Sequence, residues 1–259
     1  DFGHAIARQT DGKIIVVGYS YEGSHKIALA RYNPDGSLDD TFDGDGMVAT
    51  EYAEGPAYGN AVALQADGKI VVAGSTAYGA LDFVLMRYSS NGSLDGTFDT
   101  DGMLSTDFAG QFDECMAVLI QPDGKILAAG YNDNASNDDF ALARYNPNGS
   151  LDTGFDDDGL LVTDLSGGND RGYGLALQPN GKIVVVGYAT GIVRDYAVVR
   201  YHPDGSLDST FSGDGILLVD FLGFYDFGHA VVLQPDGKII LAGNISTGYS
   251  SDFGVVRLK

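Results

Sequence analysis

The sequence repeats itself with a period of 56 or 57 residues, and this periodicity constrains the fold more than any other feature. The stretch RYNPDGSLDDTFDGDG, which begins at Arg31, recurs in closely related form at Arg87, Arg144 and Arg200. A second motif, Asp or Asn followed by Gly-Lys and an apolar run, begins at Asp11, Asp67, Asp123, Asn180 and Asp236. Self-similarity at a fixed period is the signature of a repeat architecture. We divide the chain into repeats 2–57, 58–113, 114–170, 171–226 and 227–259 and expect them to form one domain.

Each repeat contains four segments with the character of β-strands. In the second repeat these are 59–65, 69–74, 82–89 and 103–108, separated by turn signals such as Asp-Gly and Asn-Gly. No segment predicts a helix longer than one turn. Four short strands per repeat are typical of a β-propeller blade, whereas the coils of a β-solenoid, the alternative architecture, are usually shorter. The sequence therefore predicts an all-β chain, a β-propeller built from four-stranded antiparallel blades.

The fifth repeat has only 33 residues and stops after its third predicted strand. We therefore expect five blades, the last one incomplete, with residues 252–258 forming an exposed edge. Unpaired strand edges are templates for association, so we expect a neighbouring chain or a larger parent protein to cover this edge. We also expect repeats one and five to pack together and close the ring.

One arginine occupies the same strand position in every repeat. These residues are Arg31, Arg87, Arg144, Arg200 and Arg257. A buried charge without a partner costs several kcal/mol. We therefore expect the five arginines to be largely buried and paired with aspartates of the blade.

The net charge of −21 restricts the partners of this chain. Nucleic acids and anionic membranes are bound through basic surfaces, so neither is expected as a partner. The longest apolar runs last only a few residues, far less than a membrane span requires, and we expect no membrane insertion. Cys115 is the single cysteine, which excludes an internal disulfide. The acidic, Gly-rich and Tyr-rich composition favours a secreted or cell-surface protein.

The pattern AVxLQPDGKIxxAG…DFAxxRYNPDGSLDxxFxxDG resembles the delta-60 repeat, a bacterial β-propeller repeat without a defined activity. The resemblance extends over essentially all 259 residues, and the blades resemble those of NHL-type propellers more loosely. It implies tandem blades in exported or surface-attached bacterial proteins. It transfers no catalytic residues, because the family has none to transfer.

The aspartate-rich end of the long motif suggests a calcium site. An EF-hand loop needs a glutamate at position 12, but counting from Asp39 places Thr50 there, so an EF-hand is rejected. A looser site stays open, and its candidate ligands are Asp43, Asp45, Asp99, Asp101, Asp156 and Asp158. The alternative is that Asp-Gly closes the turn into the fourth strand. We favour this second interpretation and expect no cofactor.

The sequence offers little support for catalysis. It contains no GxSxG, HExxH or Gly-rich phosphate loop, and no acidic pair of the kind that a glycosidase needs is evident. Asp1, Asp113, Asp170 and Asp226 share one column and could surround a channel mouth or simply be solvated. We therefore expect that the chain is not an enzyme.

The loops between second and third strands, and between fourth and first strands, differ from repeat to repeat, whereas the other connections barely vary. In an up-and-down blade both variable loops leave at the same end, which favours an adaptable binding surface. The candidate ligand-face residues are Tyr21, His25, Tyr78, Asp138, Arg194 and Tyr249. We expect a non-catalytic scaffold or adhesion module that binds a protein or glycan there. The alternative is a carbohydrate-active propeller, either a lectin or a glycoside hydrolase or lyase.

Overall fold

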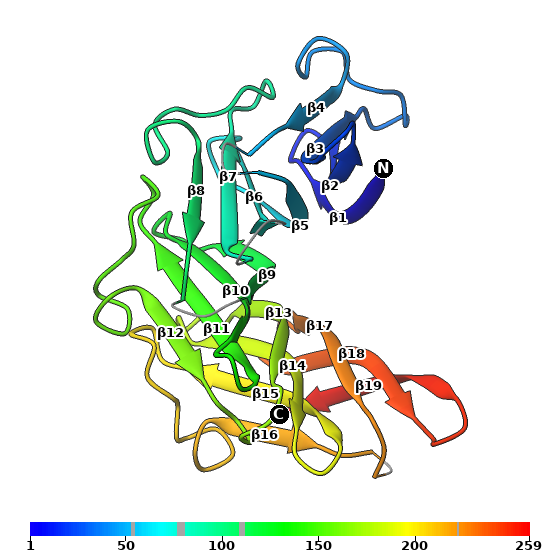
Figure 1. Cartoon of the computed structure of the whole chain (residues 1–259), viewed down its shortest axis with the longest axis vertical. Helices are drawn as coiled ribbons and strands as arrows, with labels where there is room; N and C mark the ends of the chain where they lie inside the picture. Colours follow the sequence, from blue (N-terminus) through cyan, green and yellow to red (C-terminus); the bar gives the residue numbers. More distant parts are fainter. Residues whose placement is uncertain (53–54, 77–80, 109–111, 222) are drawn as a thin grey trace. The chain divides into compact units, whose positions relative to one another are not determined.

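The computed structural model describes residues 1–52, 55–76, 81–108, 112–221 and 223–259. These residues form nineteen β-strands and no helix (Figure 1). The strands make five sheets in which sequence neighbours pair antiparallel. Four sheets have four strands and the fifth has three. This confirms the predicted β-propeller blades and the incomplete fifth blade.

The strands follow the repeats closely. The first sheet comprises β1 (Phe2–Arg8), β2 (Ile14–Tyr21), β3 (His25–Tyr32) and β4 (Met47–Thr50). The second comprises β5 (Ala57–Leu64), β6 (Ile70–Thr76), β7 (Phe83–Tyr88) and β8 (Met103–Thr106). The third comprises β9 (Phe112–Ile120), β10 (Ile126–Asp133), β11 (Asp138–Tyr145) and β12 (Leu160–Thr163). The fourth comprises β13 (Arg171–Leu177), β14 (Ile183–Thr190), β15 (Arg194–Tyr201) and β16 (Ile216–Val219), and the fifth β17 (Phe227–Leu233), β18 (Ile239–Ser246) and β19 (Ser251–Leu258).

The chain divides into two compact units, and we describe each by itself. Unit 1 contains Asp1–Ala128 and Tyr145–Ser150, and unit 2 contains Ala129–Arg144 and Leu151–Lys259. The single-domain organisation and the packing of repeat one against repeat five stay predictions. No helix in the described part of the chain could span a lipid bilayer.

Short turns connect the first and second strands of each sheet. In the first sheet Gly12 has a φ of 90°, and Asp11 Oδ1 accepts the backbone N–H of Lys13 at 3.1 Å. The same side-chain contact recurs at the four equivalent turns, at Asp67, Asp123, Asn180 and Asp236. Asp and Asn suit this position because their side chains bond to the backbone two residues on, while Gly adopts positive φ without strain.

A β-bulge interrupts the first strand at the same point in four sheets. The register between first and second strands shifts between Gly3 and Ala5, and it shifts again at the equivalent places in β5, β13 and β17. The bulge brings a carbonyl of the first strand onto a glycine of the second. A Cβ added at Gly187 would lie 1.8 Å from the carbonyl oxygen of Arg171. This contact explains why the apolar run after Gly-Lys ends in glycine.

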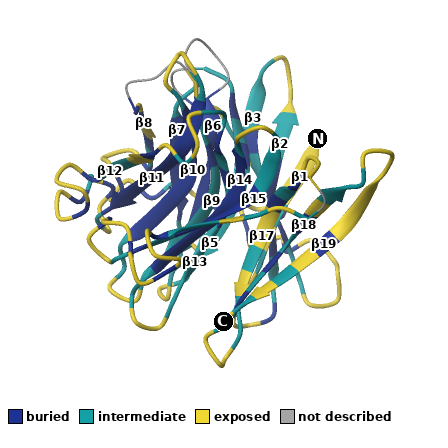
Figure 2. Ribbon diagram, turned by 90° about the horizontal axis from the view of Figure 1, so that it is seen from below, coloured by how far each residue is buried: buried dark blue, intermediate teal, exposed yellow. Residues whose placement is uncertain are grey.

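The middle strands of the sheets carry the apolar core (Figure 2). β6 and β7 are buried along their whole length, as their β-branched and apolar sequences suggest. In unit 1, Ile15 and Val17 of β2 pack in one cluster with Ile70, Val72 and Val84. In unit 2, Val184 and Val186 of β14 belong to a cluster with Leu241 of β18. Within each unit, these neighbouring blades therefore stack through the flat faces of their sheets.

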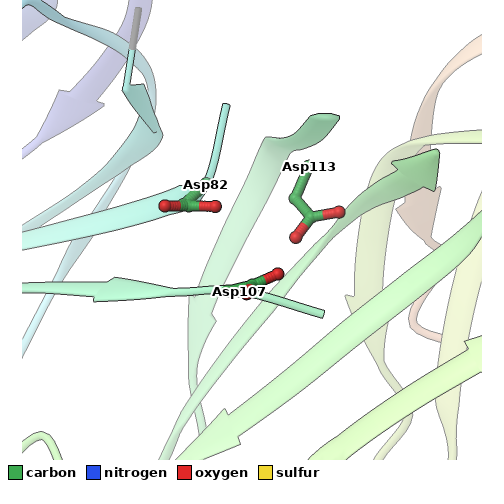
Figure 3. A group of neighbouring side chains, drawn as sticks. All are labelled: Asp82, Asp107 and Asp113. Atoms are coloured by element: carbon green, nitrogen blue, oxygen red, sulfur yellow. The ribbon is translucent and has the colours of Figure 1, made fainter. Parts of the chain in front are cut away.

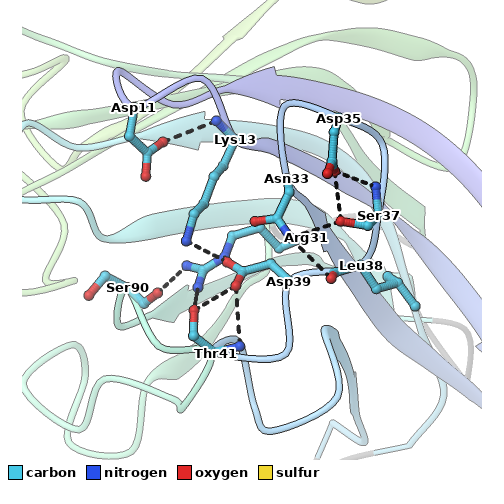
Figure 4. Close-up of polar contacts among 10 residues, drawn as sticks. All are labelled: Asp11, Lys13, Arg31, Asn33, Asp35, Ser37, Leu38, Asp39, Thr41 and Ser90. Atoms are coloured by element: carbon cyan, nitrogen blue, oxygen red, sulfur yellow. Dashed lines mark hydrogen bonds and ion pairs between the residues drawn. The ribbon is translucent and has the colours of Figure 1, made fainter.

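The repeated arginines hold the loop that follows the third strand. Arg31 Nε lies 2.5 Å from Asp39 Oδ2, and Lys13 Nζ lies 2.7 Å from the same oxygen (Figure 4). The guanidinium also lies over the ring of Phe42, 4.6 Å from its centroid, and donates to the carbonyl of Ser90 in the next sheet. Equivalent pairs join Arg87 to Asp95, Arg144 to Asp152 and Arg200 to Asp208. For these four arginines the predicted burial and pairing are confirmed.

The prediction is wrong for Arg257, which is exposed. The aspartate partner stands eight residues after the arginine in the other repeats, and the sequence contains no such position after Arg257. The burial and pairing of the repeated arginine therefore depend on the aspartate in the loop after the third strand as much as on the strand itself.

A further set of contacts repeats between neighbouring sheets. The hydroxyl of Tyr88 donates to Thr50 Oγ1 at 2.8 Å, and that of Tyr201 donates to Thr163 Oγ1 at 2.9 Å. The backbone N–H of Asp43 donates to the carbonyl of Asn91 at 2.8 Å. Residues at constant positions of the repeat thus form the contacts within a blade and also the contacts between that blade and the next.

Candidate functional site

The variable loops lie at one end of each sheet. Because the strands pair antiparallel in chain order, the connection from second to third strand and the connection from the fourth strand to the next blade leave at the same end. There, the end of the second strand and the start of the third meet the first strand of the following blade. We call this place the junction niche. The same three strand segments form the niche wherever one blade follows another, but the side chains on these segments differ from niche to niche.

The niche between the first and second sheets, in unit 1, is aromatic. The rings of Tyr19 and Tyr58 meet edge to face, with centroids 4.8 Å apart. His25 Nδ1 lies 3.3 Å from the hydroxyl of Tyr58, and its ring contacts that of Tyr21, which is 63% exposed. Tyr21 and His25, two of the predicted ligand-face residues, therefore belong to one cluster.

The niche between the third and fourth sheets, in unit 2, holds an ion pair. Arg171 Nε lies 2.6 Å from Asp138 Oδ2, and the guanidinium stacks on Tyr131 at 4.2 Å from the ring centroid. Burial alone would lower the pKa of Arg171, but the hydrogen bond to Asp138 and the electrostatic interactions with Asp138, Tyr131 and Tyr188 together outweigh burial and raise that pKa. Asp138 is only 7% exposed, so this predicted ligand-face residue is used inside the protein.

The niche between the fourth and fifth sheets, also in unit 2, opens into a pocket of about 450 Å³. It is lined by Thr190, Ile192, Arg194, Tyr225, Phe227, Ser246 and Ser251. The Arg194 guanidinium lies 5.0 Å from the ring centroid of Tyr188, 5.3 Å from that of Phe227 and 5.9 Å from that of Tyr225. The pocket thus combines aromatic rings, three aliphatic hydroxyl groups, the phenol of Tyr225 and one cation. Arg194 is the predicted ligand-face residue that the structure places in a pocket.

The charge of Arg194 is not neutralised within the described part of the chain. Its side chain forms no ion pair and no hydrogen bond to any described residue. Arg171, one niche earlier, has its own carboxylate partner. A stacked guanidinium keeps its five N–H donors in a fixed plane. Arg194 can therefore bind an oxygen anion at little entropic cost.

Three groups of carboxylates recur at the same end of the sheets. Asp82 precedes β7, Asp107 follows β8 and Asp113 lies in β9, and Figure 3 shows that the three carboxylates converge. One oxygen or more of each lies within 4.8 Å of the others. The equivalent groups are Asp139, Asp164 and Asp170, and Asp195, Asp220 and Asp226. Carboxylate oxygens are suitable ligands for Ca²⁺. Among the described residues, these three groups therefore have the ligands that a divalent cation needs.

The third aspartate of each group also braces the loops. Asp170 Oδ2 accepts the backbone N–H of Leu165 at 2.8 Å, and its Oδ1 accepts that of Thr190 at 2.9 Å. Asp226 makes equivalent bonds to Phe221 and Ser246. Asp113, Asp170 and Asp226 are at most 1% exposed. Of the two alternatives, solvation is wrong for these three aspartates, because backbone donors replace water at their carboxylates, whereas Asp1 of the same column is exposed.

Burial and, to a smaller extent, mutual repulsion raise the pKa of carboxyls in these groups. The pKa of Asp195 is raised, first because burial disfavours its charge and then because Asp220 and Asp226 lie nearby. Burial likewise raises the pKa of Asp139, with smaller contributions from Asp164 and Asp170. A proton or a cation would relieve this repulsion.

The six aspartates predicted as a loose calcium site lie elsewhere, after the third strand. Asp45, Asp101 and Asp158 each accept the backbone N–H two residues on, at 2.8 to 2.9 Å. Asp43, Asp99 and Asp156 have positive φ and donate their backbone N–H to the next sheet. None of them belongs to a three-carboxylate group in the described residues. The structure thus shows their role in turns, and calcium binding stays an untested alternative that the sequence disfavours.

Two predicted ligand-face residues lie outside these clusters. Tyr78 falls outside the described residues, and Tyr249 is fully exposed at the β18–β19 loop. Sequence reasoning did not select Arg171, Tyr188 and Phe227 as ligand-face candidates. The available signal was variation within an otherwise uniform column: Phe2, Tyr58, Glu114, Arg171 and Phe227 occupy one position of the repeat.

Unit 1 also has a larger pocket, of about 650 Å³, at the opposite ends of the first strands. It is lined by successive turns, including Gln9, Gln65 and Gln121. These glutamines repeat in every blade. Because this lining belongs to the structural framework, we take the variable end as the candidate functional site.

Solved structures show which proteins share this fold. A protein of unknown function from Dyadobacter fermentans is 12% identical, with a TM-score of 0.61, and the match covers 98% of this chain and 74% of that one. The periplasmic gluconolactonase of Pseudomonas aeruginosa is 13% identical, with a TM-score of 0.53 and coverages of 98% and 71%. A putative gluconolactonase is 14% identical, with a TM-score of 0.50 and coverages of 99% and 76%.

These similarities correct the expectation that the chain is not an enzyme. That expectation rested on missing catalytic motifs, yet two proteins with a similar fold are described as gluconolactonases. The absence of a short motif therefore does not exclude catalysis, because a propeller assembles its site from residues far apart in the sequence.

Sequence comparison places the repeats in a family. No curated protein shows significant sequence similarity to this chain. The profile described as a domain of unknown function (DUF5122) beta-propeller matches residues 9–42, 65–98, 121–155, 178–211 and 234–259, which is more than half of the sequence. The chain therefore belongs to the DUF5122 β-propeller family.

Proposed function

We propose that this chain is a carbohydrate-active β-propeller that binds a sugar in the pocket beside Arg194. The observation that carries the proposal is the composition of that pocket: two aromatic rings, three aliphatic hydroxyl groups and a cation around about 450 Å³. A pocket of this size accepts a small molecule, and a few polar groups among apolar walls fix its orientation. The apolar face of a sugar ring would stack on Tyr225 or Phe227, while its hydroxyls would bond to Thr190, Ser246 or Ser251.

The loops around the pocket are firmly supported. The N–H of Asp226 donates to the carbonyl of Arg194 at 2.7 Å, and Asp226 Oδ1 accepts the N–H of Ser246 at 3.1 Å. A buried aspartate therefore joins two segments of the pocket wall. A site held in this way is preorganised, which lowers the entropic cost of binding.

The gluconolactonases of similar fold suggest the reaction to test first. Hydrolysis of a sugar lactone adds water to the carbonyl carbon and breaks the ring C–O bond. The products are a hydroxyl group, a carboxylate and one released proton. Arg194 would face the carboxylate that forms. Turnover would make the chain an enzyme, and binding without turnover would make it a lectin.

The test uses saturation-transfer NMR and calorimetry with D-glucose and D-glucono-1,5-lactone, together with proton release from the lactone. Tyr225 is 55% exposed, so Tyr225→Ala should fold normally. Aromatic contacts contribute about 0.5–1.5 kcal/mol, and we expect this variant to weaken sugar binding by about 2- to 10-fold. Tyr249→Ala, on an exposed tyrosine outside the pocket, is the matched control. Failure to bind either sugar, or equal effects of the two variants, would contradict the proposal.

We also propose an extracellular or cell-surface location, and a neighbouring chain or parent-protein segment on the edge of β19. The acidic net charge supports partners other than nucleic acid. The finer resemblance to the delta-60 repeat is compatible with membership of the DUF5122 family and is proposed on the motifs alone.

A further inference from the structure

We propose that the ligand of the Arg194 pocket carries a carboxylate, and that Arg194 binds this group as an ion pair. The inference rests on the proposed sugar-binding role and names its substrate class: acidic sugars, such as uronic or aldonic acids. It goes beyond that role because a neutral sugar would also satisfy the aromatic rings and hydroxyls.

The first argument is the state of Arg194 itself. The four buried framework arginines and Arg171 each pair with an aspartate. Arg194 is partly buried against three rings and lines a pocket, yet it has no carboxylate partner in the described chain. A partly desolvated guanidinium gains most from a charged acceptor, since such hydrogen bonds are about twice as strong as neutral ones.

The second argument comes from the preceding niche of the same chain. There a guanidinium (Arg171), a ring (Tyr131) and a carboxylate (Asp138) form one stack. Asp138 and Arg194 occupy equivalent positions of the repeat, as do Tyr131 and Tyr188. In the Arg194 niche the guanidinium and ring are present, but the position of Asp138 is taken by the arginine. The chain therefore supplies its own carboxylate in one niche and leaves it to a ligand in the next.

The third argument concerns specificity. With a net charge of −21 the protein repels anions at long range. Binding of an acidic sugar would therefore require a specific local cation, and a general electrostatic attraction cannot explain it. Ser246, Ser251 and Thr190 provide hydroxyls for the remaining oxygens of the ring.

The experiment compares D-glucuronate with D-glucose, which differ only at C6, by calorimetry at constant ionic strength. We expect the wild-type chain to bind glucuronate about ten-fold or more tightly than glucose, since a charge-assisted bidentate pair is lost with glucose. Arg194→Gln should abolish this preference, because it should weaken glucuronate binding far more than glucose binding. Arg257→Gln, which removes an exposed arginine on β19, is the control and should keep the preference.

A second measurement does not depend on the variant folding. With wild-type protein, the C6 carbon of ¹³C-labelled glucuronate should shift on binding, and free D-glucose should compete. Equal affinity for the two sugars, or a preference that survives Arg194→Gln in a folded variant, would overturn the carboxylate inference. In that case Tyr225→Ala would still weaken glucose binding, and the proposed function would stand. If neither sugar binds, both proposals fail.

Discussion

Arg144 illustrates how single residues of the framework stabilise a blade. Its side chain is 8% exposed, and its guanidinium pairs with Asp152 at 2.6 Å and lies over Phe155. Removing one member of a buried pair leaves the other charge uncompensated. We expect Arg144→Ala to lower the free energy of unfolding by about 3–5 kcal/mol in urea denaturation. Arg257→Ala, at the exposed equivalent, should have little effect, and similar losses in both variants would contradict the structural role.

Through Asp208, the same framework makes the stability of the protein depend on pH. Burial alone would raise its pKa, but hydrogen bonds from Lys182, Thr210 and Arg200 outweigh burial and hold that pKa well below its usual range. The folded state therefore binds this proton less tightly than the unfolded state, whose pKa is about 3.9. The stabilisation is present above that pH and is lost as the pH falls below it.

We therefore expect the melting temperature to fall as the pH is lowered below about 4, and the Asp208→Asn variant to show a flatter dependence. Asp101→Asn, at an exposed aspartate without an ion pair, should retain the wild-type slope. Identical slopes for wild type and Asp208→Asn would show that this network does not govern acid unfolding.

Asp138 tests the analogy between the two niches of unit 2. Asp138→Ala removes the carboxylate that pairs with Arg171 and leaves the guanidinium over Tyr131. We expect a lower melting temperature that acetate partly restores, relative to chloride at equal ionic strength, because acetate can replace the missing carboxylate. The wild-type chain should show no such difference. Absence of acetate rescue would indicate that the niche does not accept an external anion.

At the scale of elements, the bulge in the first strand restricts one position of the second strand to glycine. Gly187 faces the carbonyl of Arg171, and a Cβ there would approach it to 1.8 Å. We expect Gly187→Ala to disrupt the pairing of β13 with β14 and to reduce the thermal stability strongly. Gly191→Ala is the matched control, because a Cβ at Gly191 meets nothing within 4 Å. Circular dichroism melts of the two variants would check this, and a stable Gly187→Ala would argue against the bulge.

The strands were predictable from sequence, but the bulge and the acidic groups were not. Alternation, β-branched runs and Asp-Gly turns are local signals, and they gave four strands per repeat and the pairing of Arg31, Arg87, Arg144 and Arg200. A one-residue bulge leaves no local signal. The group of Asp82, Asp107 and Asp113 combines three separate segments, so only the folded blade brings its members together.

At the scale of the molecule, a uniform framework carries niches of different chemistry. Arginine pairs, tyrosine–threonine bonds and turn glycines recur in the blades, whereas the niches hold a histidine, an ion pair or an open pocket. Sequence variation therefore selected the variable end of the sheets and Arg194, which lines a pocket there; the binding of a ligand at this end stays a prediction. Sequence variation did not predict that Asp138 is already paired, because that depends on Arg171 in the next blade. Closure of repeat one on repeat five stays a prediction.

The most direct test of this account is an amide chemical-shift map of the isotopically labelled chain titrated with D-glucuronate. We predict that the perturbed amides cluster around Thr190–Arg194, Tyr225–Phe227 and Ser246–Ser251, the segments that line the Arg194 pocket. Shifts confined to the turns at Gln9, Gln65 and Gln121, or no shifts at all, would contradict the assignment of the functional site.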